Sequence, residues 1–114
     1  MSKVLSNAVV ISGSGLWTPE HIITNDELVV SYNAWANAYN AQHALAIEAG
    51  EHEPKPLSSV EFIEKASGIK QRYAYIKEGI LDVDRMHPTI PERSDETISD
   101  QAEMAVHAAR RALD

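Results

Sequence analysis

The 114-residue sequence predicts an α/β fold that is rich in helix. Residues 8–11 form a short apolar run without alternating polar residues, which is typical of a strand buried on both faces of a sheet. Several later segments combine helix-capping signals with apolar residues at helical spacing, and residues 69–77 resemble a second strand. We therefore expect helices packed on a sheet in which residues 8–11 are an interior strand.

A loop should follow that strand over residues 13–19. Gly13 and Gly15 permit positive φ, and Pro19 disfavours helix at the preceding residue. The Gly13-Ser14-Gly15 triplet has no third glycine at the spacing of a dinucleotide-binding fingerprint, and the next helix begins about ten residues later. We interpret the two glycines as a tight turn beside a closely packed backbone.

The next element is a predicted long helix over residues 24–49, which Gly50 can end. Thr24 and Glu27 have the spacing of a capping box. Five apolar residues then share one stripe: Leu28, Tyr32, Trp35, Tyr39 and Ala46. The aromatic stripe could line an apolar tunnel, but packing in a core or subunit interface is the favoured interpretation.

An exposed connector is predicted at residues 51–57, because Pro54 and Pro56 prevent regular structure. A short helix should occupy residues 58–67, since Ser58 and Glu61 repeat the capping-box spacing and Gly68 supplies a stop.

The remaining elements are predicted as a strand, a loop and a helix. Residues 69–77 should be the strand, and residues 79–93 a loop with a helical turn near 82–86. Residues 97–113 carry apolar and alanine side chains at helical spacing, which predicts a closely packed helix. No end signal closes this helix, so we expect the chain to be the opening part of a larger α/β body.

Composition narrows the classes of function. Seventeen acidic and ten basic side chains give a formal net charge of −7, which argues against a general nucleic-acid binder. The absence of cysteine excludes disulfides and thiolate sites from these residues. No apolar run approaches the roughly 18 residues of a membrane helix, and no signal peptide is evident, so a cytoplasmic location is expected.

Neither a metal nor a cofactor is expected. The five histidines lack the spacing of metal ligands: they are His21, His43, His52, His87 and His107.

Four segments carry recognisable motifs in a fixed order. Residues 11–19 read ISGSGLWTP and fit an opening strand with a G-x-y-x-P loop, and residues 24–28, TNDEL, fit a TN-x-(D/E)-L helix start. Residues 62–72, FIEKASGIKQR, resemble W-I-x-x-(R/T)-(T/S)-G-I-x-x-R, and residues 99–113 resemble an S-x-M-A-x-x-A-x-x-A-L helix. Together they resemble the N-terminal part of β-ketoacyl-acyl carrier protein synthase III and its thiolase-fold relatives.

This resemblance implies a decarboxylating Claisen condensation between an acyl-CoA primer and malonyl-acyl carrier protein, in fatty acid or related acyl-chain synthesis. It also implies an incomplete N-terminal part of one thiolase-like domain over residues 1–114, and a homodimer of the full-length chain. The family's catalytic Cys, His and Asn lie beyond the matched part, so the 114 residues alone should be inactive.

The resemblance also implies which residues of this sequence form part of a coenzyme A entrance. Its matching positions are Ser58, Phe62, Ala66 and Ser67, although the family has tryptophan at the position of Phe62 and arginine at that of Ala66. Three cations within this motif could contact an acidic carrier protein: Lys65, Lys70 and Arg72. From composition alone, the favoured interpretation is structural, with Gly68 as a helix cap and Arg72 as an ion-pairing residue.

Residues 30–57 are longer than the corresponding part of compact family members. We expect this helical insertion to lie over the substrate entrance or dimer edge and to accompany a medium-length acyl primer. The alternative function, from a different class, is a noncatalytic helical interaction module that binds a partner through the Trp35 stripe.

Overall fold

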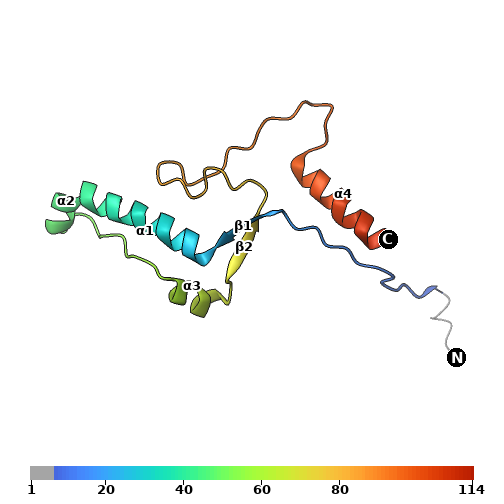
Figure 1. Cartoon of the computed structure of the whole chain (residues 1–114), viewed down its shortest axis with the longest axis horizontal. Helices are drawn as coiled ribbons and strands as arrows, with labels where there is room; N and C mark the ends of the chain where they lie inside the picture. Colours follow the sequence, from blue (N-terminus) through green and yellow to red (C-terminus); the bar gives the residue numbers. More distant parts are fainter. Residues whose placement is uncertain (1–6) are drawn as a thin grey trace. The chain divides into compact units, whose positions relative to one another are not determined.

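The computed structural model describes residues 7–114, which divide into two units (Figure 1). The described part of the first unit comprises residues 7–18 and 92–114, and the second is Pro19–Pro91. The described elements are β1 (His21–Thr24), α1 (Asn25–Gln42), α2 (Ala44–Glu48), α3 (Val60–Ser67), β2 (Gln71–Ala74) and α4 (Asp100–Leu113). Helices and a small sheet are compatible with the predicted α/β class.

A two-stranded antiparallel sheet organises the second unit. β1 pairs with β2 in a register that places His21 opposite Ala74 and Thr24 opposite Gln71. Ile23 of β1 is 2% exposed and is one of two buried hydrophobic residues among those described. The second strand was predicted, with bounds too wide, whereas β1 was missed because four residues that end in a helix cap are too short to show alternation.

The predicted helix over residues 24–49 is two helices. Thr24 caps α1 through the predicted capping box: its hydroxyl accepts from the Glu27 N–H at 3.2 Å, and the Glu27 carboxylate accepts from the Thr24 N–H at 2.9 Å. His43 interrupts the helix with ψ near 18°, and its Nδ1 lies 2.9 Å from the Tyr39 carbonyl oxygen. Gly50 then follows α2 with φ of 79°.

The two later helices are confirmed with shorter bounds. α3 begins after Ser59, whose hydroxyl accepts from the Phe62 N–H at 3.1 Å, so Ser59 rather than Ser58 is the cap. α4 begins after Ser99 instead of at residue 97. Residues 82–86 form the expected turn, in which the Met86 N–H donates to the Asp82 carbonyl at 2.7 Å.

The prediction of a buried strand at residues 8–11 is wrong for this structure. These residues lie outside any strand, and Val9 and Ile11 are 94% and 93% exposed. A strand needs a neighbour to satisfy its backbone groups, and neither described strand pairs with this segment. β-branched composition alone therefore did not determine strand formation.

Gly13 and Gly15 serve close packing rather than a left-handed turn. Neither has positive φ, and a Cβ at either position would collide with the backbone of α4, at the Ala112 carbonyl for Gly13 and the Ala108 carbonyl for Gly15. The ring of Trp17 stacks on His107 of α4, with centroids 5.6 Å apart. The predicted close packing of this loop is thus confirmed.

Candidate functional site

The helix α3 carries the motif from which the candidate site was predicted, and both of its ends are capped. Gly68 adopts φ of 72° and donates its N–H to the Glu64 carbonyl at 2.7 Å. The Ser67 hydroxyl donates to the Ile63 carbonyl at 2.7 Å and accepts from the Ile69 N–H at 3.1 Å. In this structure the hydroxyl of Ser67 therefore stabilises the helix end.

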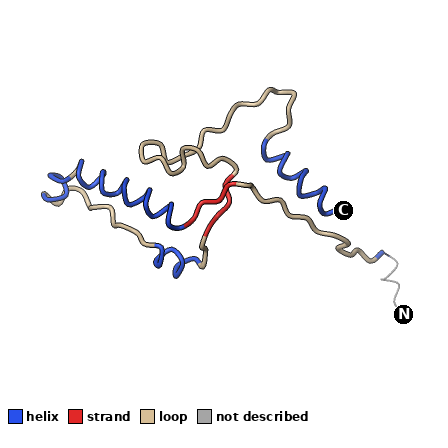
Figure 2. Tube along the Cα trace, viewed as in Figure 1, coloured by secondary structure: helices blue, strands red, loops and turns tan. Residues whose placement is uncertain are grey.

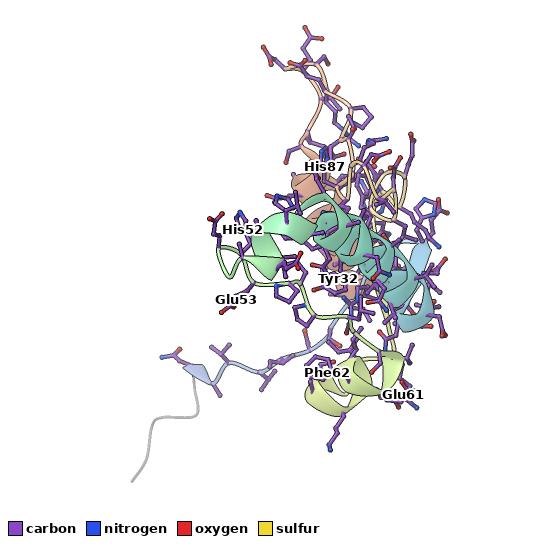
Figure 3. All side chains as sticks on the ribbon, turned by 90° about the vertical axis from the view of Figure 1, so that its left-hand side faces the viewer. Tyr32, His52, Glu53, Glu61, Phe62 and His87 are labelled. Atoms are coloured by element: carbon purple, nitrogen blue, oxygen red, sulfur yellow. The ribbon has the colours of Figure 1, made fainter. Side chains whose placement is uncertain are left out.

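One face of α3 forms a shallow hollow. Phe62, Lys65 and Ala66 line this space of about 390 Å³, because residues three and four apart lie on the same helix face. Phe62 is 65% exposed and is labelled on α3 in Figure 3. The hollow therefore offers an aromatic ring, an ammonium and a methyl group to a ligand, and three predicted site residues meet there.

The remaining predicted residues do not line this hollow and lie before, at the end of and after α3 in the chain. Ser58 precedes the cap of α3 and is half-buried. The Lys70 ammonium lies 3.7 Å from the Glu64 carboxylate, and both side chains are exposed. This ion pair partly compensates the lysine charge, and because it is exposed it contributes little to stability. Arg72 is exposed on β2, opposite Ile23. The predicted cationic cluster is thus spread over α3, the following turn and β2.

The connector between α2 and α3 runs back along α1 (Figures 1 and 2). Asn33 exchanges two hydrogen bonds with the backbone of Ser58, at 2.8 and 3.0 Å, and Asn40 does the same with Lys55 at 2.8 and 3.0 Å. The Tyr32 hydroxyl donates to the Pro56 carbonyl at 2.9 Å. Sequence analysis missed this docking, although the pair of asparagines seven residues apart was a usable signal.

The aromatic stripe of α1 packs within its own unit. Ring centroids lie 5.8 Å apart between Tyr32 and Trp35 and 5.6 Å apart between Trp35 and Tyr39. The ring of His43 stacks on Tyr39 at 4.1 Å, and the Lys55 ammonium lies 5.1 Å from the Tyr39 centroid. The stripe therefore supports the connector, which agrees with the packing interpretation.

Charge at the junction of β1 and α1 is organised around Glu27. The Lys77 ammonium donates to its carboxylate at 2.7 Å and also to the Ile22 carbonyl at 2.9 Å. The hydrogen bond from Lys77, followed by that from the Thr24 N–H, lowers the pKa of Glu27 below its usual value. This network ties β1, α1 and the segment after β2 together.

A search of the described part of the chain finds no metal site and no membrane-spanning helix, but it does find a second hollow. No group of three or more His, Cys, Asp or Glu side chains over residues 7–114 is arranged to hold a metal ion. None of the helices in that part is both long and apolar enough to cross a membrane. A second hollow of about 410 Å³ is mostly apolar and is lined by Asp26, Glu27, Val30, Ser31, Ala34, Leu81 and Val83.

Comparison with known proteins gives one informative similarity. A scan against models of protein families finds no match. The chain is 57% identical over 83 residues to a protein of Pseudomonas aeruginosa named beta-ketodecanoyl-[acyl-carrier-protein] synthase. The match covers 73% of this chain and 24% of the relative, so the chain spans about a quarter of the relative's length. This level of identity confirms the resemblance that the four ordered motifs predicted.

Proposed function

We infer that these residues belong to a condensing enzyme of the β-ketoacyl-[acyl-carrier-protein] synthase III type. The inference follows from the sequence identity to the Pseudomonas aeruginosa synthase. The single observation that carries the proposal is 57% identity across most of the chain. In this proposal the 114 residues are the N-terminal part of a thiolase-like layered domain. We also propose that the full-length protein is a homodimer and is located in the cytoplasm.

The proposed reaction has two steps. A cysteine thiolate attacks the acyl-CoA thioester, and the acyl group moves to the cysteine while CoA leaves as its thiol after protonation. Malonyl-acyl carrier protein then loses carbon dioxide, and the resulting carbanion attacks the acyl thioester and releases the cysteine thiolate. No cysteine occurs in these 114 residues, so the nucleophile must be contributed by chain outside them.

The hollow on α3 is proposed as part of the coenzyme A entrance. The exposed ring of Phe62 offers a face on which an adenine can stack, and Lys65 brings positive charge beside it. Ala66 provides no charge where the family has arginine, so the affinity for the nucleotide of coenzyme A should be lower. Ser58 supplies a hydroxyl to the proposed entrance, and Ser67, whose hydroxyl donates to the Ile63 carbonyl, can contribute only as an acceptor.

A medium-length acyl-CoA is the proposed primer. The relative's name specifies a β-ketodecanoyl product, whose acyl group has ten carbons, and the condensation adds two of them. An eight-carbon primer accounts for such a product. We propose that the insertion over residues 30–57, with its docked connector, accompanies this preference, and that Lys65, Lys70 and Arg72 contribute to contact with malonyl-acyl carrier protein.

Kinetics of the complete protein test this proposal. Transfer rates should be measured with acyl-CoAs of two to twelve carbons, and the eight-carbon substrate is expected to be preferred. Phe62→Ala should raise the KM for acyl-CoA by about two- to ten-fold, the equivalent of one aromatic stacking contact. Phe62→Trp should retain a low KM, and Tyr73→Ala, which removes an exposed ring from β2, is the matched control. Preference for acetyl-CoA would contradict the primer assignment.

The alternative of a noncatalytic interaction module receives no support from the aromatic stripe. Tyr32 and Tyr39 already contact the chain's own connector through Pro56 and Lys55. A partner that bound this stripe would have to displace those contacts.

A further inference from the structure

Two asparagines on α1 hold the connector in a single register. The side chain of Asn33 accepts from the Ser58 N–H and donates to the Ser58 carbonyl, and Asn40 forms the same pair with Lys55. Each asparagine thereby satisfies both backbone groups of one residue, as a neighbouring strand would.

The spacing of the two pairs matches along both segments. Asn33 and Asn40 are seven residues apart on α1, which corresponds to about 10.5 Å of helix rise. Lys55 and Ser58 are three residues apart, and three extended residues span about 10 Å. The connector therefore has to be extended for both pairs to form, and Pro54 and Pro56 favour that conformation.

The prolines also exclude the neighbouring registers. Lys55 has an N–H group, whereas Pro54 and Pro56 on either side of it have none. A slip of one residue in either direction would place a proline opposite Asn40 and leave the asparagine oxygen without its donor. The register is thus specified by the sequence, through the two asparagines and the two prolines.

This register sets where the candidate entrance begins. Asn33 fixes the backbone of Ser58, and the next residue, Ser59, caps α3 at the Phe62 N–H. The Ser58 hydroxyl forms no hydrogen bond within residues 7–114, so it is available to a ligand while the Ser58 backbone is held. Asn33 itself is half-buried on α1 and does not line the hollow of Phe62.

We propose that Asn33 is a positioning residue for the coenzyme A entrance, acting through the backbone of Ser58 to place the Ser58 hydroxyl and the ring of Phe62. This inference rests on the proposed function, because it assigns a nucleotide to the hollow on α3. Asn40 holds the connector three residues farther from α3, so its effect on the entrance should be smaller.

The test uses four variants of the complete protein. Asn33→Ala removes the inner pair, and Asn33→Asp keeps the acceptor for the Ser58 N–H but loses the donor to its carbonyl. Asn40→Ala removes the outer pair. Asn37→Ala is the matched control, since the Asn37 side chain is exposed on the same helix and forms no hydrogen bond with the described residues. Steady-state kinetics with acyl-CoA and with malonyl-acyl carrier protein are combined with amide hydrogen exchange over residues 52–60.

Asn33→Ala should raise the KM for acyl-CoA by about five-fold, the equivalent of one net hydrogen bond, with kcat and the KM for malonyl-acyl carrier protein within about two-fold. Asn33→Asp should lie between this variant and wild type, Asn40→Ala should stay within about two-fold, and Asn37→Ala should match wild type. Exchange at the Ser58 amide should accelerate in Asn33→Ala, and exchange at Lys55 in Asn40→Ala.

Two results would overturn the positioning role of Asn33. One is faster exchange at Ser58 with an unchanged KM for acyl-CoA. The other is a fall in kcat without a selective rise in the KM for acyl-CoA, which would indicate general destabilisation, because unfolding lowers the amount of active enzyme. Asn33→Asp provides a second, more conservative variant in case Asn33→Ala does not fold. A wild-type protein without condensing activity would contradict the proposed function instead, so the two failures are distinguishable.

Discussion

Gly68 and Gly79 share a left-handed backbone but differ in their surroundings, so alanine should destabilise the two positions by different amounts. Gly68 has φ of 72°, and a Cβ added there would meet nothing within 4 Å. Gly79 has φ of 88°, and its Cβ would lie 2.5 Å from the His87 carbonyl oxygen and 2.7 Å from Cζ of Arg85. Gly68→Ala should therefore destabilise the fold through backbone strain alone, and Gly79→Ala through backbone strain and a steric clash.

The expected costs follow from these surroundings. A left-handed alanine costs about 1–2 kcal/mol, partly offset by about 0.4–1 kcal/mol because alanine restricts the unfolded chain, which leaves about 1 kcal/mol for Gly68→Ala. Gly79→Ala should cost about 2–4 kcal/mol, since overpacking against His87 adds about 1–3 kcal/mol.

Hydrogen exchange of the complete protein measures both effects locally, over residues 60–68 for Gly68 and residues 77–87 for Gly79. Gly68→Asn should lose less stability than Gly68→Ala, because asparagine tolerates the left-handed region. The reasoning would be refuted if Gly68→Ala matched or exceeded wild type in opening free energy, or if Gly79→Ala cost no more than Gly68→Ala.

Three further predictions concern the start of α1 and the entrance. Thr24→Ala should reduce the opening free energy of the first turn of α1 by about 1 kcal/mol, read from exchange at the Glu27 amide, whereas Thr24→Ser should retain most of it. Because Lys77 and Thr24 lower the folded-state pKa of Glu27, its carboxylate stabilises the fold in full above the unfolded value of about 4.3 and loses this effect as pH falls through the folded value. Urea titrations of wild type and Glu27→Gln should therefore converge in acid, and a constant difference would contradict the assignment. Ala66→Arg should lower the KM for acyl-CoA by about two- to five-fold, since it places a cation beside Phe62, and an unchanged KM would count against a nucleotide there.

Local signals in the sequence were sufficient where a few neighbouring residues determine the structure. The Thr24 capping box and the Gly68 stop are short-range hydrogen-bond and φ requirements, and both occur as predicted. Phe62 and Ala66 were proposed as site residues from the family resemblance, and both line the hollow because residues four apart share a helix face.

Features that depend on distant residues were predicted poorly. Residues 8–11 have strand-like composition but no strand partner among the described residues, and His21–Thr24 becomes a strand only because β2 lies beside it. The docking of the connector joins Asn33 to Ser58 across 25 positions. The two asparagines seven residues apart were a signal, but their spacing alone does not identify the backbone groups that they bind. The break at His43 was likewise missed, because the apolar stripe continues through it.

The most direct test of the proposed condensing activity is the mass of the product. The complete protein should be incubated with octanoyl-CoA and malonyl-acyl carrier protein, and the carrier protein analysed by mass spectrometry. We expect the carrier protein to carry a ten-carbon β-ketoacyl group, with release of free CoA and carbon dioxide. Recovery of malonyl-acyl carrier protein unchanged, with no CoA released from any acyl-CoA tested, would contradict a condensing enzyme.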